Sequence, residues 1–221
     1  MTNLIETLIE ESLQTLTQAR KGVYRHYEFP QTENMIKVAI GMRRSGKTYF
    51  LYQTINKLLE QGIKREQILY INFEDERILP MDAKQMGVLL DSFYTLYPKN
   101  HQRKCYIFLD EVQNVTNWYL TVRRYFDSKN VELFLTGSSA KLLSKEINTS
   151  LRGRSLAIEI LPYSFNEYLA AHGIKLSMDP FGRASFDIAL NHLRQYINLG
   201  GFPAVQFLAT KDWRETLQSY L

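Results

Sequence analysis

The fold of this chain is decided by eight consecutive residues, Gly41-Met42-Arg43-Arg44-Ser45-Gly46-Lys47-Thr48. They fit the pattern G-x-x-x-x-G-K-[ST], which forms a phosphate-binding loop (P-loop) when a strand precedes it and a helix follows it. The apolar residues 36–40 come before the pattern, and residues 49–60 have helical spacing. The glycines let backbone N–H groups curl around an anion, and the helix N-terminus adds positive potential. The sequence therefore predicts a nucleoside triphosphate site.

The loop and the first helical residues are expected to hold the nucleotide. Lys47 should reach the β- and γ-phosphates, and the Thr48 hydroxyl should ligate magnesium. The simpler alternative is a glycine-rich turn that only joins a strand to a helix, and the context and a second motif downstream argue against it. The expected nucleotide-binding residues are Gly41, Arg43, Arg44, Ser45, Gly46, Lys47, Thr48 and Tyr49.

The composition is that of an ordinary globular protein. The 221 residues are 45% hydrophobic and 23% charged, a length that suits one α/β domain with or without a small appendage. No apolar run approaches the ~20 residues that a membrane-spanning helix needs, and the first residues lack the basic start of a secretory signal. A single cysteine, Cys105, fits a cytoplasmic location. The net charge of +4 permits contact with DNA but does not argue for it.

Strands and helices alternate through the first 161 residues. Strands apolar on both faces are typical of a parallel sheet with helices on both sides, so we expect an α/β three-layer sandwich. Right-handed crossovers would bring the loops after these strands to one edge, where the later strand ends share a site with the P-loop. The expected strands cover residues 36–40, 68–73, 105–109, 131–136 and 156–161.

Three parts are expected along the chain. Residues 1–34 combine a helical pattern with a connector, and residues 35–161 form the P-loop core. Residues 162–221 are helical only and begin with a capping box, Ser164 to Glu167, followed by a helix from about Phe186 to Leu199. The last helical pattern stops without a capping signal, so we expect the chain to continue into a further C-terminal domain.

Two carboxylates follow the third apolar strand. Asp110 is expected to hold magnesium opposite Thr48, and Glu111 to polarise an attacking water. A carboxylate in this position favours hydrolysis over transfer to a bulky acceptor. The alternative is that Asp110 and Glu111 only cap the next helix. Gln113 is either a second group that orients water or a plain surface residue.

Polar and basic residues near the last two strands extend the expected site. The first choice for a side chain that faces the γ-phosphate is Ser138, with Thr136 and Ser139 close behind, and a helix N-cap is the competing role. Arg152 and Arg154 are candidates for an arginine finger directed at a neighbouring subunit, which can accelerate phosphoryl transfer ~10³–10⁵-fold. The competing interpretation is a pair of solvated surface arginines.

In this order and spacing, the motifs resemble a prokaryotic AAA-type ATPase family. The resemblance implies an additional-strand P-loop fold with strand order 5-1-4-3-2, followed by a helical lid, and members typically carry a second, poorly characterised domain after this core. It also implies ATP rather than GTP. The motifs that carry it are residues 41–48, 110–113, 136–139, 151–155, 161–165 and 200–203.

The resemblance also implies a role for each site residue. Pro203 of the segment Gly201-Phe202-Pro203 would touch the adenine, although this segment is also an ordinary helix breaker. The sensor arginine expected in the lid is not evident, and Arg194 is a weak match. The remaining implied roles are Lys47 on phosphate, Thr48 and Asp110 on Mg²⁺, Glu111 on water and Ser138 on the γ-phosphate.

Three functions remain open at this level. The leading one is Mg²⁺-dependent ATP hydrolysis coupled to conformational change, where a finger acting in trans would make turnover depend on a homo-oligomer. The second is a nucleotide-controlled switch with slow hydrolysis that presents a surface to DNA or to a protein partner, in part through the missing C-terminal domain. The third is a small-molecule P-loop kinase, which Glu111 and the lack of an acceptor-pocket signature disfavour.

Overall fold

A central sheet of five parallel strands organises the protein. The computed structural model describes residues 4, 6–12, 22–137, 149–151, 153–176, 183–208, 212, 213, 216 and 218. The sheet order is β2-β4-β6-β1-β7, which is the expected order 5-1-4-3-2 read from the other edge. The strands are β1 (Ile36–Ile40), β2 (Ile68–Asn72), β4 (Cys105–Asp110), β6 (Val131–Gly137) and β7 (Ser155–Glu159).

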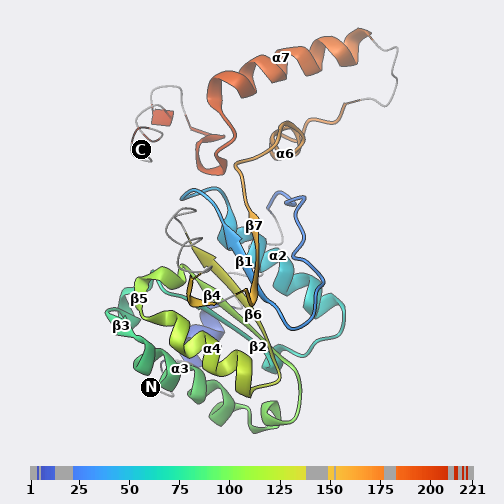
Figure 1. Cartoon of the computed structure of the whole chain (residues 1–221). Helices are drawn as coiled ribbons and strands as arrows, with labels where there is room; N and C mark the ends of the chain where they lie inside the picture. The colour runs from blue at the N-terminus through green and yellow to red at the C-terminus, as the bar shows by residue number, and fades with distance from the viewer. Residues whose placement is uncertain are drawn as a thin grey trace.

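Helices cover both faces of this sheet (Figure 1). On one face, α2 (Lys47–Glu60) packs against strand side chains such as Phe108. On the other face, α3 (Ala83–Leu96) and α4 (Trp118–Ser128) pack against strand side chains such as Leu109. Neighbouring strand residues point to opposite faces, so the uninterrupted apolar strands supply both cores. The predicted three-layer α/β architecture is confirmed.

Two strands were not predicted. β3 (Met81–Asp82) and β5 (Val115–Thr116) pair in a separate two-stranded sheet. A two-residue strand is too short to show the alternation by which strands are predicted from sequence. Short 3₁₀ turns link the larger elements at Arg65–Gln67, Glu76–Ile78, Pro98–His101, Val112–Asn114 and Pro203–Val205.

The N-terminal residues and the connector both lie against the core. Helical residues 6–12 bury Leu8 and Ile9 in the same cluster as α3 and α4. The connector, residues 22–35, then runs beside α2, where the backbone N–H and C=O of Arg25 both bond the Gln53 amide at 2.8 Å. The chain therefore enters β1 along a fixed path.

A helical lid follows β7 and lies beyond the carboxyl ends of β1 and β7 (Figure 1). The predicted capping box starts α6 (Phe165–Ala171), where the Glu167 carboxylate accepts from the Ser164 N–H at 2.8 Å. The long helix α7 (Arg183–Leu199) starts earlier than the expected Phe186, because residues 183–185 contain no helix breaker. Within the described ranges, no helix is long and apolar enough to cross a membrane.

Candidate nucleotide-binding site

The loop between β1 and α2 has a sharply turned backbone. Arg44 and Gly46 have positive φ angles of 61° and 99°, which place left-handed conformations on both sides of Ser45. A Cβ at Gly46 would also lie 2.3 Å from a guanidinium nitrogen of Arg25, so only glycine fits. Because α2 starts at Lys47, the positive end of this helix lies at the loop.

Lys47 lies buried inside this loop. Its ammonium donates to the carbonyls of Gly41 and Met42 at 3.3 and 3.0 Å and lies 3.3 Å from the Glu111 carboxylate. The side chain is only 3% exposed, so its charge acts in a site with little water. The structure thus brings the P-loop lysine and the candidate water-activating carboxylate together.

Asp110 ends β4 and is fully buried beside the loop. Its Oδ2 accepts from the Thr48 hydroxyl at 2.7 Å and from the Tyr70 hydroxyl at 2.8 Å, and its Oδ1 accepts from Thr136. Burial raises the pKa of Asp110, and the three hydroxyl donors oppose that shift. Burial and the Asp110 charge raise the pKa of Tyr70, which keeps its hydroxyl protonated as a donor. The hydroxyls therefore fix the orientation of this carboxylate.

Glu111 has a left-handed backbone, and its side chain does not cap the turn that follows it. Its φ of 52° is left-handed, an uncommon state for a residue other than glycine. Its side chain makes no capping bond to the following turn. Instead it accepts from the Gln113 amide at 2.6 Å, while its own N–H donates to Thr136 at 2.9 Å. The Glu111 carboxylate is therefore held by the Gln113 amide and not by a capping bond.

A pocket of about 630 Å³ opens in front of these groups. Lys47, Thr48 and Glu111 form its inner wall, and Tyr49 and Arg43 lie at its mouth. Pro203 and Ala204 reach it from the lid, so the Gly-x-Pro segment lies beside the P-loop, as the resemblance implied. Arg194 is exposed on α7 and does not line it. The full lining is Arg43, Arg44, Gly46, Lys47, Thr48, Tyr49, Glu74, Glu111, Pro203 and Ala204.

The donors beside the pocket suit a magnesium ion bound jointly with phosphate. Thr48 and Asp110 offer hard oxygen donors, which Mg²⁺ prefers. Mg²⁺ is usually held by one or two carboxylates, waters and substrate phosphates rather than by an all-protein cage. The described residues contain no cluster of three or more acidic, histidine or cysteine side chains that could hold a metal.

Of the predicted residues near the last two strands, the structure describes Thr136 and Arg154. Ser138, Ser139 and Arg152 lie outside the described residues. Arg154 lies at the opposite end of β1 from the P-loop, where its carbonyl accepts from the Ile36 N–H at 2.8 Å and its guanidinium pairs with Asp127 at 2.5 Å. The five residues of β1 span ~16 Å, so Arg154 cannot reach a nucleotide in its own loop.

A family model described as an AAA domain matches residues 33–169, from the end of the connector into α6. The chain belongs to this AAA family. Among curated relatives, it is 40% identical to an uncharacterised protein of Methanocaldococcus jannaschii over 221 residues, and 37% identical to an uncharacterised protein of Haemophilus influenzae over 193 residues. These alignments cover 99% and 87% of this chain but 47% and 45% of the relatives, so the chain spans about half their length.

Solved structures similar to this AAA domain include two archaeal proteins. Cdc6p from Pyrobaculum aerophilum has a TM-score of 0.43 at 15% identity, covering 84% of this chain and 49% of that one. The ADP form of the ORC2 protein from Aeropyrum pernix has a TM-score of 0.45 at 15% identity, covering 97% of this chain and 67% of that one.

Some residues of the AAA site were not predicted from the sequence. Tyr70 was expected only as part of an apolar strand, yet its hydroxyl holds Asp110. Arg25 was expected only in a connector, yet it is 1% exposed and donates to the Ser45 carbonyl within the P-loop. Neither residue belongs to a spacing pattern. Because β2 and β4 are adjacent, a polar atom near the end of β2 was the one available signal for Tyr70.

Proposed function

We propose that this AAA domain binds Mg²⁺-ATP and hydrolyses it, coupling the reaction to movement of its lid. The observation that carries the proposal is the convergence of Lys47, Thr48, Asp110 and Glu111. The Lys47 ammonium lies 3.3 Å from Glu111, and the Thr48 hydroxyl lies 2.7 Å from Asp110, both at the positive end of α2. Positioning and electrostatic stabilisation are the main contributions of a protein to phosphoryl transfer.

Each residue has a distinct part in this proposal. Lys47 and the N-terminus of α2 hold the β- and γ-phosphates. Thr48 and Asp110 would hold Mg²⁺, which would supply positive charge beside the phosphates. When phosphate oxygens replace the Glu111 carboxylate as the partner of Lys47, Glu111 becomes available to accept a proton from the attacking water. Gln113 keeps the Glu111 carboxylate in place through its 2.6 Å hydrogen bond.

The lid side of the pocket supports adenine as the base. Tyr49 and Pro203 face the pocket from opposite segments and offer flat apolar surfaces for a purine. The preference for ATP over GTP rests on the family, and the sequence has no Asn-Lys-x-Asp stretch that would read guanine.

Completion of the site by a second copy is part of the proposal. Arg154 is too far from its own P-loop, so a catalytic role for it requires the loop of a neighbouring subunit. Arg152 remains the second candidate for that role, and Ser138 the candidate for contact with the γ-phosphate. Turnover would then rise with assembly into a homo-oligomer. A cytoplasmic location is also part of the proposal, because the single cysteine of the sequence, Cys105, cannot form an internal disulfide.

The second candidate is a nucleotide-controlled switch for a DNA or protein partner. It is favoured by the chain spanning about half the length of its curated relatives, which leaves room for a partner-binding domain. Under this proposal hydrolysis is slow and resets the switch. Nucleotide-dependent partner affinity without appreciable phosphate release would support it.

The test is phosphate release from Mg²⁺-ATP over a wide range of protein concentration. We expect Lys47→Ala to weaken ATP binding by about 10–100-fold, because it removes a buried charge-assisted contact. Glu111→Gln should keep binding and lose at least ~100-fold in turnover, since it removes the group that accepts the proton. Glu74→Gln is the matched control, because Glu74 lines the same pocket but is 49% exposed and pairs only loosely with Arg43.

Three outcomes separate the alternatives. Specific activity that rises with concentration supports catalysis completed between subunits, and Arg154→Ala should then remove the rise. Tight ATP binding with no release at any concentration supports the switch. Normal turnover by Glu111→Gln would show that another group activates the water.

A further inference from the structure

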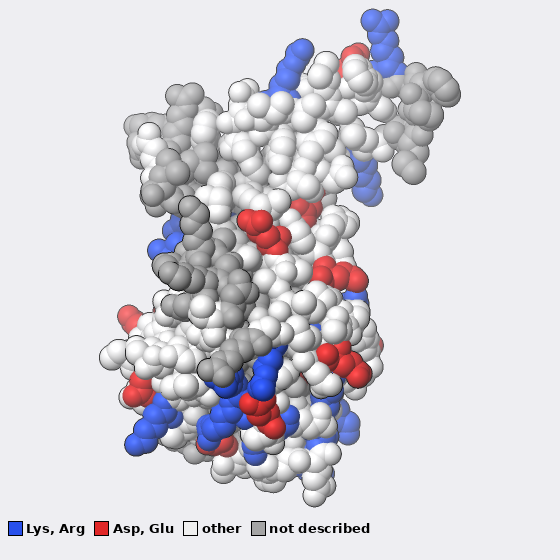
Figure 2. Space-filling model, in the orientation of Figure 1, with Lys and Arg blue, Asp and Glu red and all other residues white. Residues whose placement is uncertain are grey.

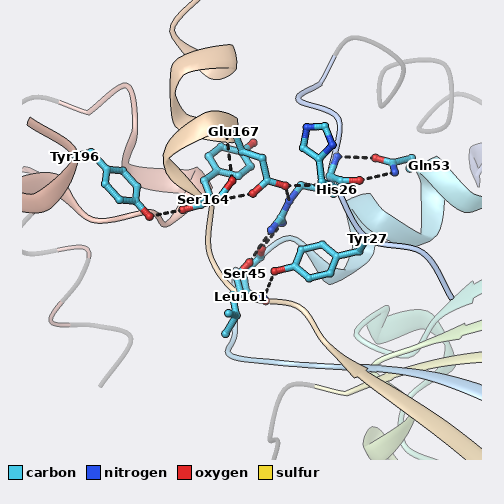
Figure 3. A network of polar contacts seen from close by, with 10 residues as sticks. His26, Tyr27, Ser45, Gln53, Leu161, Ser164, Glu167 and Tyr196 are labelled. Carbon is cyan, nitrogen blue, oxygen red and sulfur yellow. Dashed lines mark hydrogen bonds and ion pairs between the residues drawn. The ribbon is translucent and has the colours of Figure 1, made fainter. Parts of the chain in front are cut away.

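Arg25 lies where the connector, the P-loop and the lid meet, and its partners Ser45, Leu161 and Glu167 are labelled in Figure 3. Its guanidinium donates from Nη1 to the Ser45 carbonyl at 2.6 Å, from Nη2 to the Leu161 carbonyl at 2.6 Å and from Nε to the Glu167 carboxylate at 2.9 Å. The side chain is 1% exposed. A planar guanidinium with donors on three sides is suited to such a junction, whereas a lysine ammonium is not.

The contact with Ser45 bears directly on the shape of the P-loop. A trans peptide unit is planar, so its C=O and the following N–H point in opposite directions. By holding the Ser45 carbonyl, Arg25 fixes the Gly46 N–H to point away from the guanidinium. Arg44 and Gly46 both have left-handed φ angles, and an arginine in that region is strained. Arg25 therefore hydrogen-bonds the loop between Arg44 and Gly46, where the backbone conformation is most strained.

The contact with Glu167 bears on the lid. This carboxylate also accepts from the Ser164 N–H at 2.8 Å and from the His26 N–H at 3.1 Å, so it caps α6 and binds the connector at once. Burial alone would raise the pKa of Glu167, but the hydrogen bonds from Ser164 and Arg25 outweigh it and hold the pKa below its ordinary value. The buried Arg25–Glu167 ion pair favours the arrangement in which both charges are paired, because burying either charge without its partner costs free energy.

Arg25 itself cannot easily move aside. Its backbone is fixed to α2 by the two bonds to Gln53, and its guanidinium packs against the rings of Tyr27 and Tyr163 at 5.4 and 5.1 Å. Arg25 is thus clamped from its backbone to its tip. A displacement of the Ser45 carbonyl therefore acts on the guanidinium. The same guanidinium holds Glu167, which lies in the first turn of α6.

We propose that Arg25 is a positioning residue for ATP binding, and that its contacts with Ser45 and Glu167 couple the P-loop to α6. The inference deepens the proposed function and rests on it. In this protein the lid then senses the nucleotide through an arginine of the N-terminal connector. Coupling between sites is reciprocal, so ATP should stabilise α6 as much as α6 favours ATP binding.

The test combines ATP affinity with hydrogen exchange of α6 in the full chain. Arg25→Lys keeps the charge and loses the three-way contact, and Glu167→Gln acts from the lid, with no atom in the P-loop. Glu28→Gln is the matched control, because Glu28 and Lys57 form an exposed pair at 2.7 Å between the same two segments, the connector and α2. Binding is measured with Mg²⁺ and a non-hydrolysable ATP analogue, below the melting temperature of every variant.

We expect the dissociation constant to rise about tenfold for Arg25→Lys and several-fold for Glu167→Gln, and to stay within about twofold for Glu28→Gln. The analogue should slow hydrogen exchange of Phe165–Ala171 in the natural sequence and fail to do so in Arg25→Lys. A purely structural role would lower the melting temperature and leave both readouts unchanged. If Arg25→Lys does not fold, the dissociation constant and the hydrogen exchange of Glu167→Gln test the proposal in its place.

Two negative results are distinguishable. If the natural chain binds the analogue and both variants bind it equally well, the coupling through Arg25 is wrong while the proposed function stands. If the natural chain does not bind the analogue at all, the proposed function fails and this inference fails with it.

Discussion

The core and the lid of this AAA domain are held in place by different forces. In the core, strand side chains such as Phe108 and Leu109 are completely buried. In the described residues 183–208, Val205 is the one buried hydrophobic side chain, whereas Phe186, Ile197 and Phe207 are 66%, 70% and 74% exposed. Charged side chains gather mainly over the core in Figure 2, and the lid surface in that view is largely uncharged.

Residues 183–208 bury little apolar surface, and hydrogen bonds hold this part of the lid in place. The Tyr163 N–H donates to the Gly201 carbonyl at 2.6 Å, and the Tyr196 hydroxyl donates to the Tyr163 carbonyl at 2.6 Å. Gln206 closes the turn that carries Pro203 by donating to the Gly200 and Phe202 carbonyls at 2.9 Å. A close-packed core resists displacement, whereas a few hydrogen bonds can be exchanged one at a time. The lid is therefore the part suited to change position.

The largest expected effect tests the core side of this comparison. Phe108→Ala should lower the free energy of unfolding by about 3–5 kcal/mol, because it leaves a cavity beside Phe134, whose ring stacks on it at 4.3 Å. The matched lid variant Ile197→Ala should change it by less than about 0.5 kcal/mol, since that side chain is mostly exposed. Urea unfolding of both variants is the measurement, and equal losses would show that the lid is packed as tightly as the core.

A smaller, pH-dependent effect is expected at the junction between the two regions. Because the folded pKa of Glu167 lies below its unfolded value, its contribution to stability is present above about pH 4.3 and is lost as the pH falls through the folded pKa. Glu167→Gln should therefore cost about 1.5–3 kcal/mol at pH 7, and the difference should shrink in acid.

Unfolding curves between pH 7 and pH 3 measure this difference, with Glu28→Gln as the exposed control. Glu28 also pairs with a cation but is 63% exposed, so its loss should change little at any pH. A difference for Glu167→Gln that stays constant into acid would contradict a folded carboxylate stabilised by its charge.

The smallest expected effect concerns the lid alone. Tyr196→Phe removes the hydroxyl that bonds Tyr163 and should cost about 0.5–1.5 kcal/mol. Because few apolar contacts connect α7 to the core, the loss should appear as faster hydrogen exchange in Arg183–Leu199 with no shift in core unfolding. A shift of the whole unfolding curve would mean that lid and core unfold as one unit.

The features that were predicted correctly depend on local sequence patterns and on the parallel arrangement of the strands. Apolar strands and the P-loop are contiguous in sequence, and parallel strands end at one edge, so the meeting of Lys47, Thr48 and Asp110 could be inferred. The absence of a side-chain capping bond from Glu111 and its bond to Gln113 could not be predicted from the sequence.

The contacts that could not be predicted join residues far apart in the sequence. Glu167 was recognised as a cap of α6, but its second partner, Arg25, lies 142 positions earlier. No periodicity relates two such residues, and a lone arginine in a connector is ordinarily solvated. The contact of the Tyr70 hydroxyl with Asp110 could not be predicted either. A strand pattern indicates which face of the sheet a side chain occupies, but not which atom it hydrogen-bonds.

That separation has a consequence for the order in which the chain folds. Arg25 is made long before Glu167, and closing so long a loop is entropically costly, so the pair can form only after the intervening sheet has brought its ends together. Until then the Arg25 guanidinium lacks its carboxylate partner next to a partly assembled P-loop. A ribosome-bound chain that has not yet released residue 167 should therefore carry a folded sheet with an immature loop, and nucleotide binding should begin abruptly once α6 emerges.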